Sequence, residues 1–267
     1  GWSSSGSGAL AGMIPLPSPS EPLTDRGAPS QGPNQSDRKQ MVDFLLSARG
    51  LNKHFRSGNE PVPVLTDLSL HLERGESLAL TGRSGSGKST LLNILCGLEH
   101  PDSGRLQVLG ETFDSRDPQT GNKVEARWGN LRRQQIGVVF QEANLMPALP
   151  LLDNVRLRAR LAGHDDDDCQ DWLERLGIGE LADRFPDQVS GGQRQRAALA
   201  MVFAMKPALI LADEPTGSLD RHTAEAVIGQ LFELQARHGC GLILATHDPE
   251  LATRCSQHLD LGHLPEN

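Results

Sequence analysis

The stretch that decides the fold reads Gly82-Arg-Ser-Gly-Ser-Gly-Lys-Ser-Thr90 and fits the pattern G-x-x-x-x-G-K-[S/T]. A short apolar run, Ser77 to Thr81, precedes it. Apolar residues at helical spacing follow it, namely Leu91, Ile94, Leu95 and Leu98. A strand that passes through a glycine-rich turn into a helix is the setting that this pattern requires. We therefore predict a loop that binds phosphate groups through its backbone N–H groups and the positive end of the helix.

The residue types in this loop indicate a nucleoside triphosphate. Lys88 is expected to reach the β- and γ-phosphates, and the Ser89 hydroxyl to complete the coordination of Mg²⁺. The alternative is an ordinary glycine-rich turn, which the four fixed positions in a strand–helix setting disfavour. The nucleotide-binding residues predicted here are Gly82, Arg83, Ser84, Gly85, Ser86, Gly87, Lys88, Ser89 and Thr90.

A second apolar run, Ala208 to Ala212, leads directly into the acidic pair Asp213-Glu214. The carboxyl end of a strand is where ligands bind in open α/β sheets. Asp213 is placed to hold Mg²⁺ directly or through water, and Glu214 to polarise an attacking water as a general base. Two acids at a strand end are often only a solvated turn, but the loop at Gly82–Ser89 makes the catalytic interpretation stronger.

Two further polar residues close apolar runs of the same kind. Gln141 follows Ile136 to Phe140, and His247 follows Gly241 to Ala245. A glutamine at this edge can bind Mg²⁺ or water, and a histidine can hydrogen-bond a γ-phosphate. Each residue alone would more often be a capping or turn group. Their shared position at strand ends places them among the catalytic candidates with Lys88 and Glu214.

Short apolar runs that alternate with helical patterns indicate an α/β fold with a mostly parallel sheet covered on both faces. Residues Val64 to Leu72 alternate apolar and polar side chains, as a half-buried antiparallel strand does. A mostly helical stretch from about Asp153 to Met205 interrupts the alternation. We therefore predict a nucleotide-binding core over 41–267 with an antiparallel β subdomain and an inserted helical subdomain at about 142–205.

Half of residues 1–40 are glycine, serine or proline. Such a segment buries too little apolar surface to offset the entropy of ordering it, so we expect a disordered tail. Its Ser/Gly-rich beginning does not resemble a natural start, and the tail is expected to be at least partly an addition to the natural chain. Met13 and Met41 are both possible natural starts.

Composition excludes several classes of protein. The net charge of −8 argues against a general nucleic-acid binder, which needs a dominant basic face. Four scattered cysteines are too few for a disulfide scaffold or a metal cluster, and we expect free thiols. No apolar run reaches the ~18–20 residues needed to cross a bilayer, so any membrane role is expected through a partner.

With Ser190-Gly191-Gly192-Gln193 added to these motifs, the chain resembles the nucleotide-binding subunit of an ATP-binding cassette (ABC) transporter. The order of motifs is that of the family over about 41–267. Leu91 to Leu98, Asn154-Val155 and Ala212 to Gly217 resemble the branch of lipoprotein-release, macrolide-export and cell-division ATPases. The resemblance implies that Phe55 stacks on adenine, and that Ser190, Gly191, Gly192, Gln193 and Asp220 belong to the nucleotide site.

The resemblance also implies partners. The signature at Ser190–Gln193 completes the ATP site of a second copy, head to tail, and Glu142 to Leu161 docks an integral membrane permease subunit. An ATPase of this kind lies on the cytoplasmic face of the bacterial inner membrane, peripheral to it. The alternative within the family is an ATPase that transmits force or regulates a membrane complex without transporting cargo.

Three rival classes share parts of this pattern. Chromosome- and repair-type ATPases place a long coiled coil before the signature, but only about a hundred residues separate Lys88 from Ser190 here. Translation-factor types carry two cassettes in one chain, and this chain has one set of motifs. A catalytically dead subunit would lack some of the groups that are present, namely Lys88, Asp213, Glu214 and His247.

Overall fold

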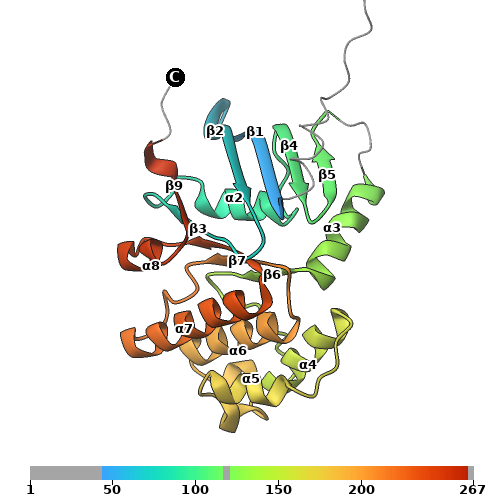
Figure 1. Ribbon diagram of the computed structural model, residues 1–267, viewed down its shortest axis with the longest axis vertical. Coiled ribbons are helices and arrows are strands. Elements are labelled where there is room, and N and C mark those ends of the chain that lie inside the picture. Colours follow the sequence, from blue (N-terminus) through green and yellow to red (C-terminus); the bar gives the residue numbers. More distant parts are fainter. Residues whose placement is uncertain (1–43, 117–120, 264–267) are drawn as a thin grey trace, which may run out of the picture.

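A parallel sheet of five short strands runs through the middle of the molecule (Figure 1). The computed structural model describes residues 44–116 and 121–263, so the predicted tail over 1–40 and both candidate starts lie outside the described residues. The sheet contains the four apolar runs predicted from the sequence. It also contains a fifth, polar strand that the sequence did not reveal. In sheet order the strands are β6 (Ile136–Val139), β7 (Leu209–Asp213), β8 (Gly241–Ala245), β3 (Ser77–Thr81) and β9 (Gln257–Asp260).

Both faces of this sheet are covered, which is why its central strands are apolar throughout. In β7, Leu209 and Leu211 pack into one hydrophobic cluster, while Ile210 and Ala212 pack into a second cluster on the opposite face. Each fully buried leucine or isoleucine side chain contributes about 1.5–3 kcal/mol to stability. The predicted fold class, a P-loop core with a mostly parallel sheet, is confirmed.

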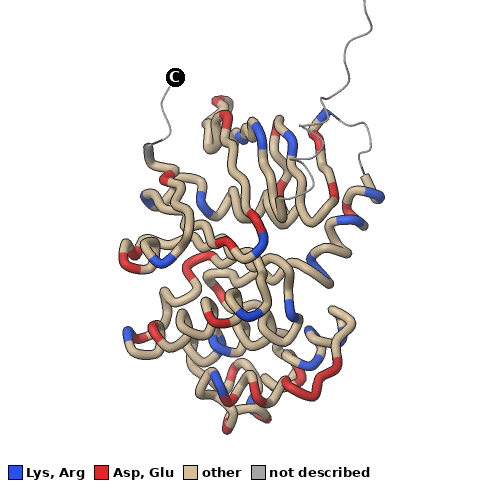
Figure 2. The backbone as a smooth tube through the Cα atoms, in the orientation of Figure 1, with Lys and Arg blue, Asp and Glu red and all other residues tan. Residues whose placement is uncertain are grey.

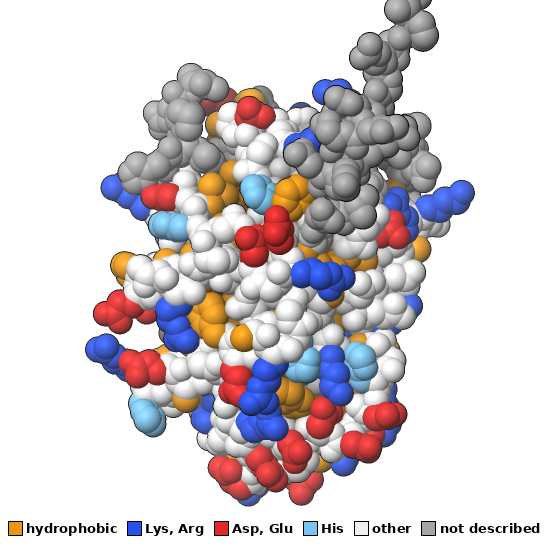
Figure 3. Space-filling model, viewed as in Figure 1, with side chains coloured by type: hydrophobic (Ala, Val, Ile, Leu, Met, Phe, Trp, Pro, Cys, Tyr) orange, Lys and Arg blue, Asp and Glu red, His pale blue; other side chains and the backbone are white. Residues whose placement is uncertain are grey.

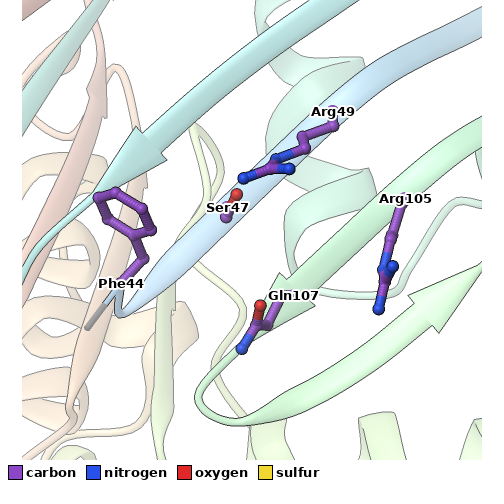
Figure 4. Close-up of a pocket in the computed structure, with 5 residues that line it drawn as sticks. All are labelled: Phe44, Ser47, Arg49, Arg105 and Gln107. Atoms are coloured by element: carbon purple, nitrogen blue, oxygen red, sulfur yellow. The ribbon is translucent and has the colours of Figure 1, made fainter. Parts of the chain in front are cut away.

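A second sheet is antiparallel and forms the upper part of the molecule in Figure 1. Its strands, in the order β2-β1-β4-β5, are β2 (Glu60–Leu72), β1 (Leu46–Ser57), β4 (Ser103–Val108) and β5 (Glu111–Asp114). Alternate residues of β1 face the core, such as Leu46 and Ala48. The others face outward, and Figure 4 shows Ser47 and Arg49 of β1 beside Arg105 and Gln107 of β4 on this outer face.

In the ranges that the structure describes, four helices flank the sheets. They are α2 (Lys88–Leu95), α3 (Asn122–Gln134), α7 (Arg221–His238) and α8 (Pro249–Thr253). The sequence predicted that Leu98 continues the helical spacing of Leu91 and Ile94, and this is wrong for Leu98. Gly97 adopts a left-handed φ of 72° and ends the helix. Leu98 is 51% exposed. A side chain at Gly97 would collide with Trp128 of α3, which explains why glycine stands there.

Below the parallel sheet in Figure 1 lies a helical layer. It contains α4 (Leu151–Leu161), α5 (Cys169–Arg175) and α6 (Gly191–Ala204), with short 3₁₀ turns at Gly179–Leu181 and Pro186–Gln188; a further 3₁₀ turn, Leu261–His263, follows β9. The boundaries of the helical subdomain, about 142–205, stay a prediction. The acidic run Asp165–Asp168 lies in this layer (Figure 2) and is paired with arginines and a lysine: Asp166 with Arg156 and Arg160, and Asp168 with Lys206.

None of the helices in the described ranges is long and apolar enough to cross a membrane. On the face shown in Figure 3, acidic and basic side chains are interspersed over the part of the chain that the structure describes. All four cysteines carry free thiols, as the sequence indicated, and burial raises the pKa of Cys169 and Cys240 to about 11.

Candidate nucleotide site

The predicted phosphate loop connects the carboxyl end of β3 to the first residue of α2. Its backbone turns tightly, with the amide of Ser86 donating to the carbonyl of Arg83 at 3.0 Å. Two positions need glycine. Gly87 precedes the helix with a φ of 97°, and a Cβ on Gly82 would lie 2.5 Å from the Ser86 hydroxyl. The loop therefore brings the free N–H groups at the start of α2 to the edge of the parallel sheet.

Lys88 lies across the mouth of this loop. Its ammonium donates to the carbonyl of Gly82 at 2.6 Å and to that of Arg83 at 3.2 Å. The positive charge is thus held over the same concavity that the backbone N–H groups and the helix dipole make favourable for anions. A phosphate group entering the concavity would find a cation already in place.

Ser89 and Asp213 meet at this edge although 124 positions separate them in the chain. The Ser89 hydroxyl donates to Asp213 Oδ2 at 2.6 Å. The two oxygens are of the type that Mg²⁺ prefers, and Mg²⁺ bound to a nucleotide needs only one or two protein oxygens because waters and phosphates complete its shell. The pair fits Mg²⁺. The described residues contain no cluster of three or more histidine, cysteine or carboxylate groups that could hold a different kind of metal.

Glu214 and His247 form the second contact at this edge. Nδ1 of His247 lies 2.9 Å from Glu214 Oε1, and the Glu214 side chain is 16% exposed against 77% for His247. Glu214 has a φ of 47°, a left-handed conformation that is uncommon for a non-glycine residue. Its amide is fixed by donating to the carbonyl of Ala245 at 3.0 Å. The sharp turn after β7 therefore re-aims the carboxylate toward the end of β8, where His247 stands.

Gln141 lies at the same edge, two residues beyond the end of β6. Val139 pairs with Ala212 in the parallel register, so the chain leaves β6 next to the point where Asp213 ends β7. The carbonyl of the intervening Phe140 accepts a hydrogen bond from the buried amide of Gln195 in α6 at 3.2 Å. The exit from β6 is thereby tied to the helical layer.

A hollow of about 520 Å³ opens beside the phosphate loop. Its walls come from the first residues of the loop, from His247, and from α8 and β9. The start of the phosphate loop and His247 therefore open onto one surface of the molecule.

The signature residues lie elsewhere, in the helical layer. Ser190 caps α6, and the side chains of Ser190 and Gln193 each bind the backbone amide of the other residue. The Ser190 hydroxyl accepts from the Gln193 amide at 3.1 Å, and the Ser190 amide donates to Gln193 Oε1 at 2.8 Å. Helix α6 begins at Gly191, directly after Ser190. In the described residues no hydrogen bond joins Ser190–Gln193 to the phosphate loop.

Asp220 and Phe55 lie on other elements than the phosphate loop. Asp220 caps α7, accepting from the hydroxyl of Thr223 at 2.6 Å and from its amide at 3.0 Å, and these bonds lower the pKa of the Asp220 carboxyl. Phe55 lies near the end of β1, opposite Val62 of β2, with its side chain 42% exposed. Its ring is available for stacking.

Sequence reasoning missed the side chains that hold the loops around the site. Asn154 is 1% exposed and binds the backbone of Met146, Leu149 and Pro150, which fixes the loop that follows Gln141. Arg158 of α4 donates to the carbonyls of Arg132 and Arg133 at the end of α3. In a helical sequence pattern, polar residues indicate a face exposed to solvent. Only the fold shows that the side chains of Asn154 and Arg158 bind backbone groups of neighbouring segments.

Comparisons with known proteins agree with the geometry. The family model described as ABC transporter matches residues 65–217. YbbA, an ABC transporter ATP-binding protein of Escherichia coli strain K12, is 41% identical over 231 residues, which cover 84% of this chain and 98% of that protein. The lipoprotein-releasing system ATP-binding protein LolD of Shewanella oneidensis is 38% identical over 225 residues, which cover 83% of this chain and 95% of that protein.

A solved structure gives the same result. The ATP-binding cassette MJ0796, a dimer in a post-hydrolysis state bound to ADP and Pi, is 30% identical with a TM-score of 0.74, over 82% of this chain and 95% of that one. The cassette cbiO1 of Clostridium perfringens, part of the transporter complex cbiONQ, has a TM-score of 0.66 at 28% identity, over 82% of this chain and 86% of that one. Together these matches show that the chain belongs to the ABC transporter family, as an ATP-binding and ATP-hydrolysing subunit.

Proposed function

We propose that this chain binds ATP at the edge of its parallel sheet, hydrolyses it with Glu214 as the general base, and drives a membrane partner. The observation that carries the proposal is the meeting of four groups at one edge, in the two contacts Ser89–Asp213 and Glu214–His247. Carboxylates that lie beside a phosphate loop serve either the metal ion or the attacking water, and this arrangement separates the two tasks.

The phosphate side of the reaction belongs to the loop and to β7. Lys88 would exchange its bonds to the loop carbonyls for phosphate oxygens, while the N–H groups of α2 bind the same anion. Ser89 and Asp213 would hold Mg²⁺, which neutralises charge on the phosphate oxygens when bound. Gln141, at the same edge, would bind the ion or the water beside it.

The water side belongs to Glu214 and His247. Glu214 accepts the proton of the attacking water, and His247 keeps the carboxylate oriented through its Nδ1. The largely exposed ring of His247 is free to turn toward a γ-phosphate. Because Glu214 is only 16% exposed, few competing waters reach its carboxylate.

The signature of a second copy would close the site. In this chain the Ser190 hydroxyl accepts one hydrogen bond and retains its own proton for a phosphate oxygen. The N–H groups at the start of α6 favour the same anion. The solved cassette MJ0796 is dimeric with ADP and Pi bound. We infer a head-to-tail dimer with two ATP molecules between the copies.

We propose that the membrane partner docks on the helical layer at 142–161, and that the chain lies at the cytoplasmic face of a membrane. On α4, Leu157 and Leu161 are one turn apart and both exposed, and Met146 is 52% exposed. The arginines of α4, in contrast, are engaged within the chain: Arg156 and Arg160 pair with acids, and Arg158 binds α3. The apolar face of α4 is therefore a better docking surface than its charges.

Two relatives suggest what the cycle serves. LolD is named for a lipoprotein-releasing system, and cbiO1 is part of a transporter complex. We propose transport of a molecule by the membrane partner. Transmission of force without cargo is the second candidate, and it keeps the same ATPase chemistry. Reconstitution with the co-purified membrane protein separates the two, since only transport moves a labelled cargo in step with ATP hydrolysis.

The Glu214→Gln variant tests the chemistry. It removes the base but keeps the shape of the side chain, so we expect kcat to fall by about 100-fold or more with ATP binding retained. The ATP-bound dimer should accumulate, which size-exclusion chromatography with ATP and Mg²⁺ would detect. Glu225→Gln, an exposed change on α7, is the matched control and should hydrolyse ATP at the parental rate. A parental rate for Glu214→Gln would show that another group is the base.

A further inference from the structure

A lysine with little exposure lies two residues before the proposed adenine platform. Lys53 is 9% exposed, and its ammonium nitrogen is 5.2 Å from the centre of the Phe55 ring. The 5.2 Å separation shows that the lysine and the ring lie side by side on β1. Lysines are rarely enclosed to this degree unless the charge is paired.

The ammonium of Lys53 is held by the loop that follows α2. It donates to Glu99 Oε1 at 2.6 Å and to the carbonyl of His100 at 2.8 Å, and Asp102 Oδ1 lies 3.9 Å away. The hydrogen bond from Lys53 lowers the pKa of Glu99, which favours the carboxylate form of that side chain. The cation is therefore fixed from the side of the core while it lies against the ring of Phe55.

This anchoring matters because Phe55 stands on a poorly supported part of β1. The pairing of β1 with β4 ends at Asn52 opposite Ser103, while its pairing with β2 continues to Ser57 opposite Glu60. The last residues of β1 thus belong to a two-stranded ribbon, which is marginally stable on its own. The register is irregular on both sides of Lys53. At the base of the ribbon, Lys53 bonds to Glu99 and the amide of His54 donates to Asp102 at 2.7 Å.

We propose that Lys53 is a positioning residue for the base of the nucleotide: it fixes the Phe55 ring and polarises it for stacking on a purine. The inference rests on the proposed role of Phe55 in adenine binding. A cation against an aromatic ring is attracted by the ring's negative face and draws electron density toward itself. The 42% exposed ring then presents its accessible surface to the electron-rich base.

The loop after α2 also connects Lys53 to the helix that begins at the phosphate loop. Helix α2 carries the phosphate-binding residues at its start, and the loop beyond its end holds Lys53 through Glu99. The base platform and the phosphate loop are therefore braced on the same short helix. Loss of Lys53 should loosen the base end of the nucleotide and leave the phosphate end unchanged.

The test compares Lys53→Met with the parent protein in ATP hydrolysis. We expect KM for ATP to rise about 3- to 10-fold, with kcat within about twofold, since one cation–ring contact and the order of the ribbon are lost. Inorganic tripolyphosphate is the probe without a base, and its inhibition constant should not change. Lys53→Arg should restore KM, because a guanidinium also pairs with a carboxylate and lies against rings.

A double substitution separates positioning from a general structural role. Phe55→Ala should raise KM, and adding Lys53→Met to it should raise KM no further. Additive effects, or equal weakening of tripolyphosphate, would overturn the role of Lys53. If Phe55→Ala itself leaves KM unchanged, the adenine platform of the proposed function is wrong. If Phe55→Ala raises KM but Lys53→Met does not, only the inference about Lys53 is wrong.

A second variant covers the case in which Lys53→Met does not fold. The Glu99 side chain is 35% exposed, and Glu99→Ala removes the paired carboxylate while the ammonium keeps its bond to the His100 carbonyl. We expect the same change as for Lys53→Met but smaller, about two- to threefold in KM, again with tripolyphosphate unaffected. A KM equal to that of the parent in a folded Glu99→Ala protein would contradict the proposal.

Discussion

At the carboxyl end of the parallel sheet, the proposed nucleotide-binding groups are in contact with one another within one chain. Ser89 binds Asp213, His247 lies against Glu214, and Lys88 covers its own loop. In the helical layer, the side chains of Ser190 and Gln193 bind each other's backbone amides. The sheet edge is thus pre-assembled on buried strands, whereas the signature is a capped helix end, which we propose completes its site on a second copy.

The difference indicates how the protein divides catalysis and control. Groups that must hold a metal ion and a water gain from a rigid edge, because positioning within about 0.5 Å decides their efficiency. The groups proposed to meet a second copy lie instead at the start of α6, in the helical layer. A shared hydrophobic cluster packs the helical layer against the parallel sheet, and polar contacts add to it: Arg158 binds the end of α3, and Gln195 binds Phe140.

The largest expected effect comes from disabling the phosphate loop in one copy of the chain and the signature in the other copy. Ser190→Arg blocks the signature, Lys88→Met disables the phosphate loop, and each variant alone should lose about 100-fold or more of the ATPase activity. In a head-to-tail dimer, one variant's intact loop meets the other's intact signature. An equal mixture should therefore recover up to about a quarter of the parental activity, since half of the dimers hold one whole site.

The control for this experiment is each variant mixed with a chain that carries both substitutions. No whole site can form in that mixture, so activity should stay at the level of the single variants. Recovery there, or no recovery in the complementary mixture, would show that the signature does not act across two copies.

A smaller effect is expected from loosening the link between the regions. Arg158→Met removes two charged hydrogen bonds to the carbonyls at the end of α3, at 2.6 and 2.7 Å, and should lower the free energy of unfolding by about 2 kcal/mol. Urea denaturation measures the change. Arg160→Met is the matched control on the same helix, where an exposed pair with Asp166 should be worth less than about 1 kcal/mol. Equal costs for the two variants would mean that Arg158 does not join the regions.

The smallest effect concerns the helix cap. Ser190→Ala removes the acceptor for the Gln193 amide, and the free energy of unfolding should fall by about 1 kcal/mol in the absence of nucleotide. Hydrogen exchange at the amide of Gln193 should become faster, while exchange in β7 and β8 stays slow. If the fast exchange extended into those strands, the signature would be more tightly coupled to the sheet edge than the contacts indicate.

Most of the sheet edge could be predicted because its signals are local. The five residues of β3 lie where the run Ser77 to Thr81 predicted them, and β8 coincides with Gly241 to Ala245. Strand β9 escaped prediction because Gln257–Asp260 is polar and half-exposed at the edge of the sheet, where no apolar run is required. Helix α3 escaped as well, since only Trp128 and Leu131 of its thirteen residues are buried.

The sequence by itself determined the phosphate loop, the acids at the end of β7, the signature and the family. Each is a short sequence pattern, because the residues that act together in it are neighbours in the chain. Only the tertiary structure decided that Ser89 meets Asp213, that His247 holds Glu214, and that Lys53 lies against Phe55 on a ribbon fixed by the loop after α2. These contacts depend on side-chain directions, local turns and loop closures that no local pattern encodes, and they are set when the buried faces of the two sheets pack around α2.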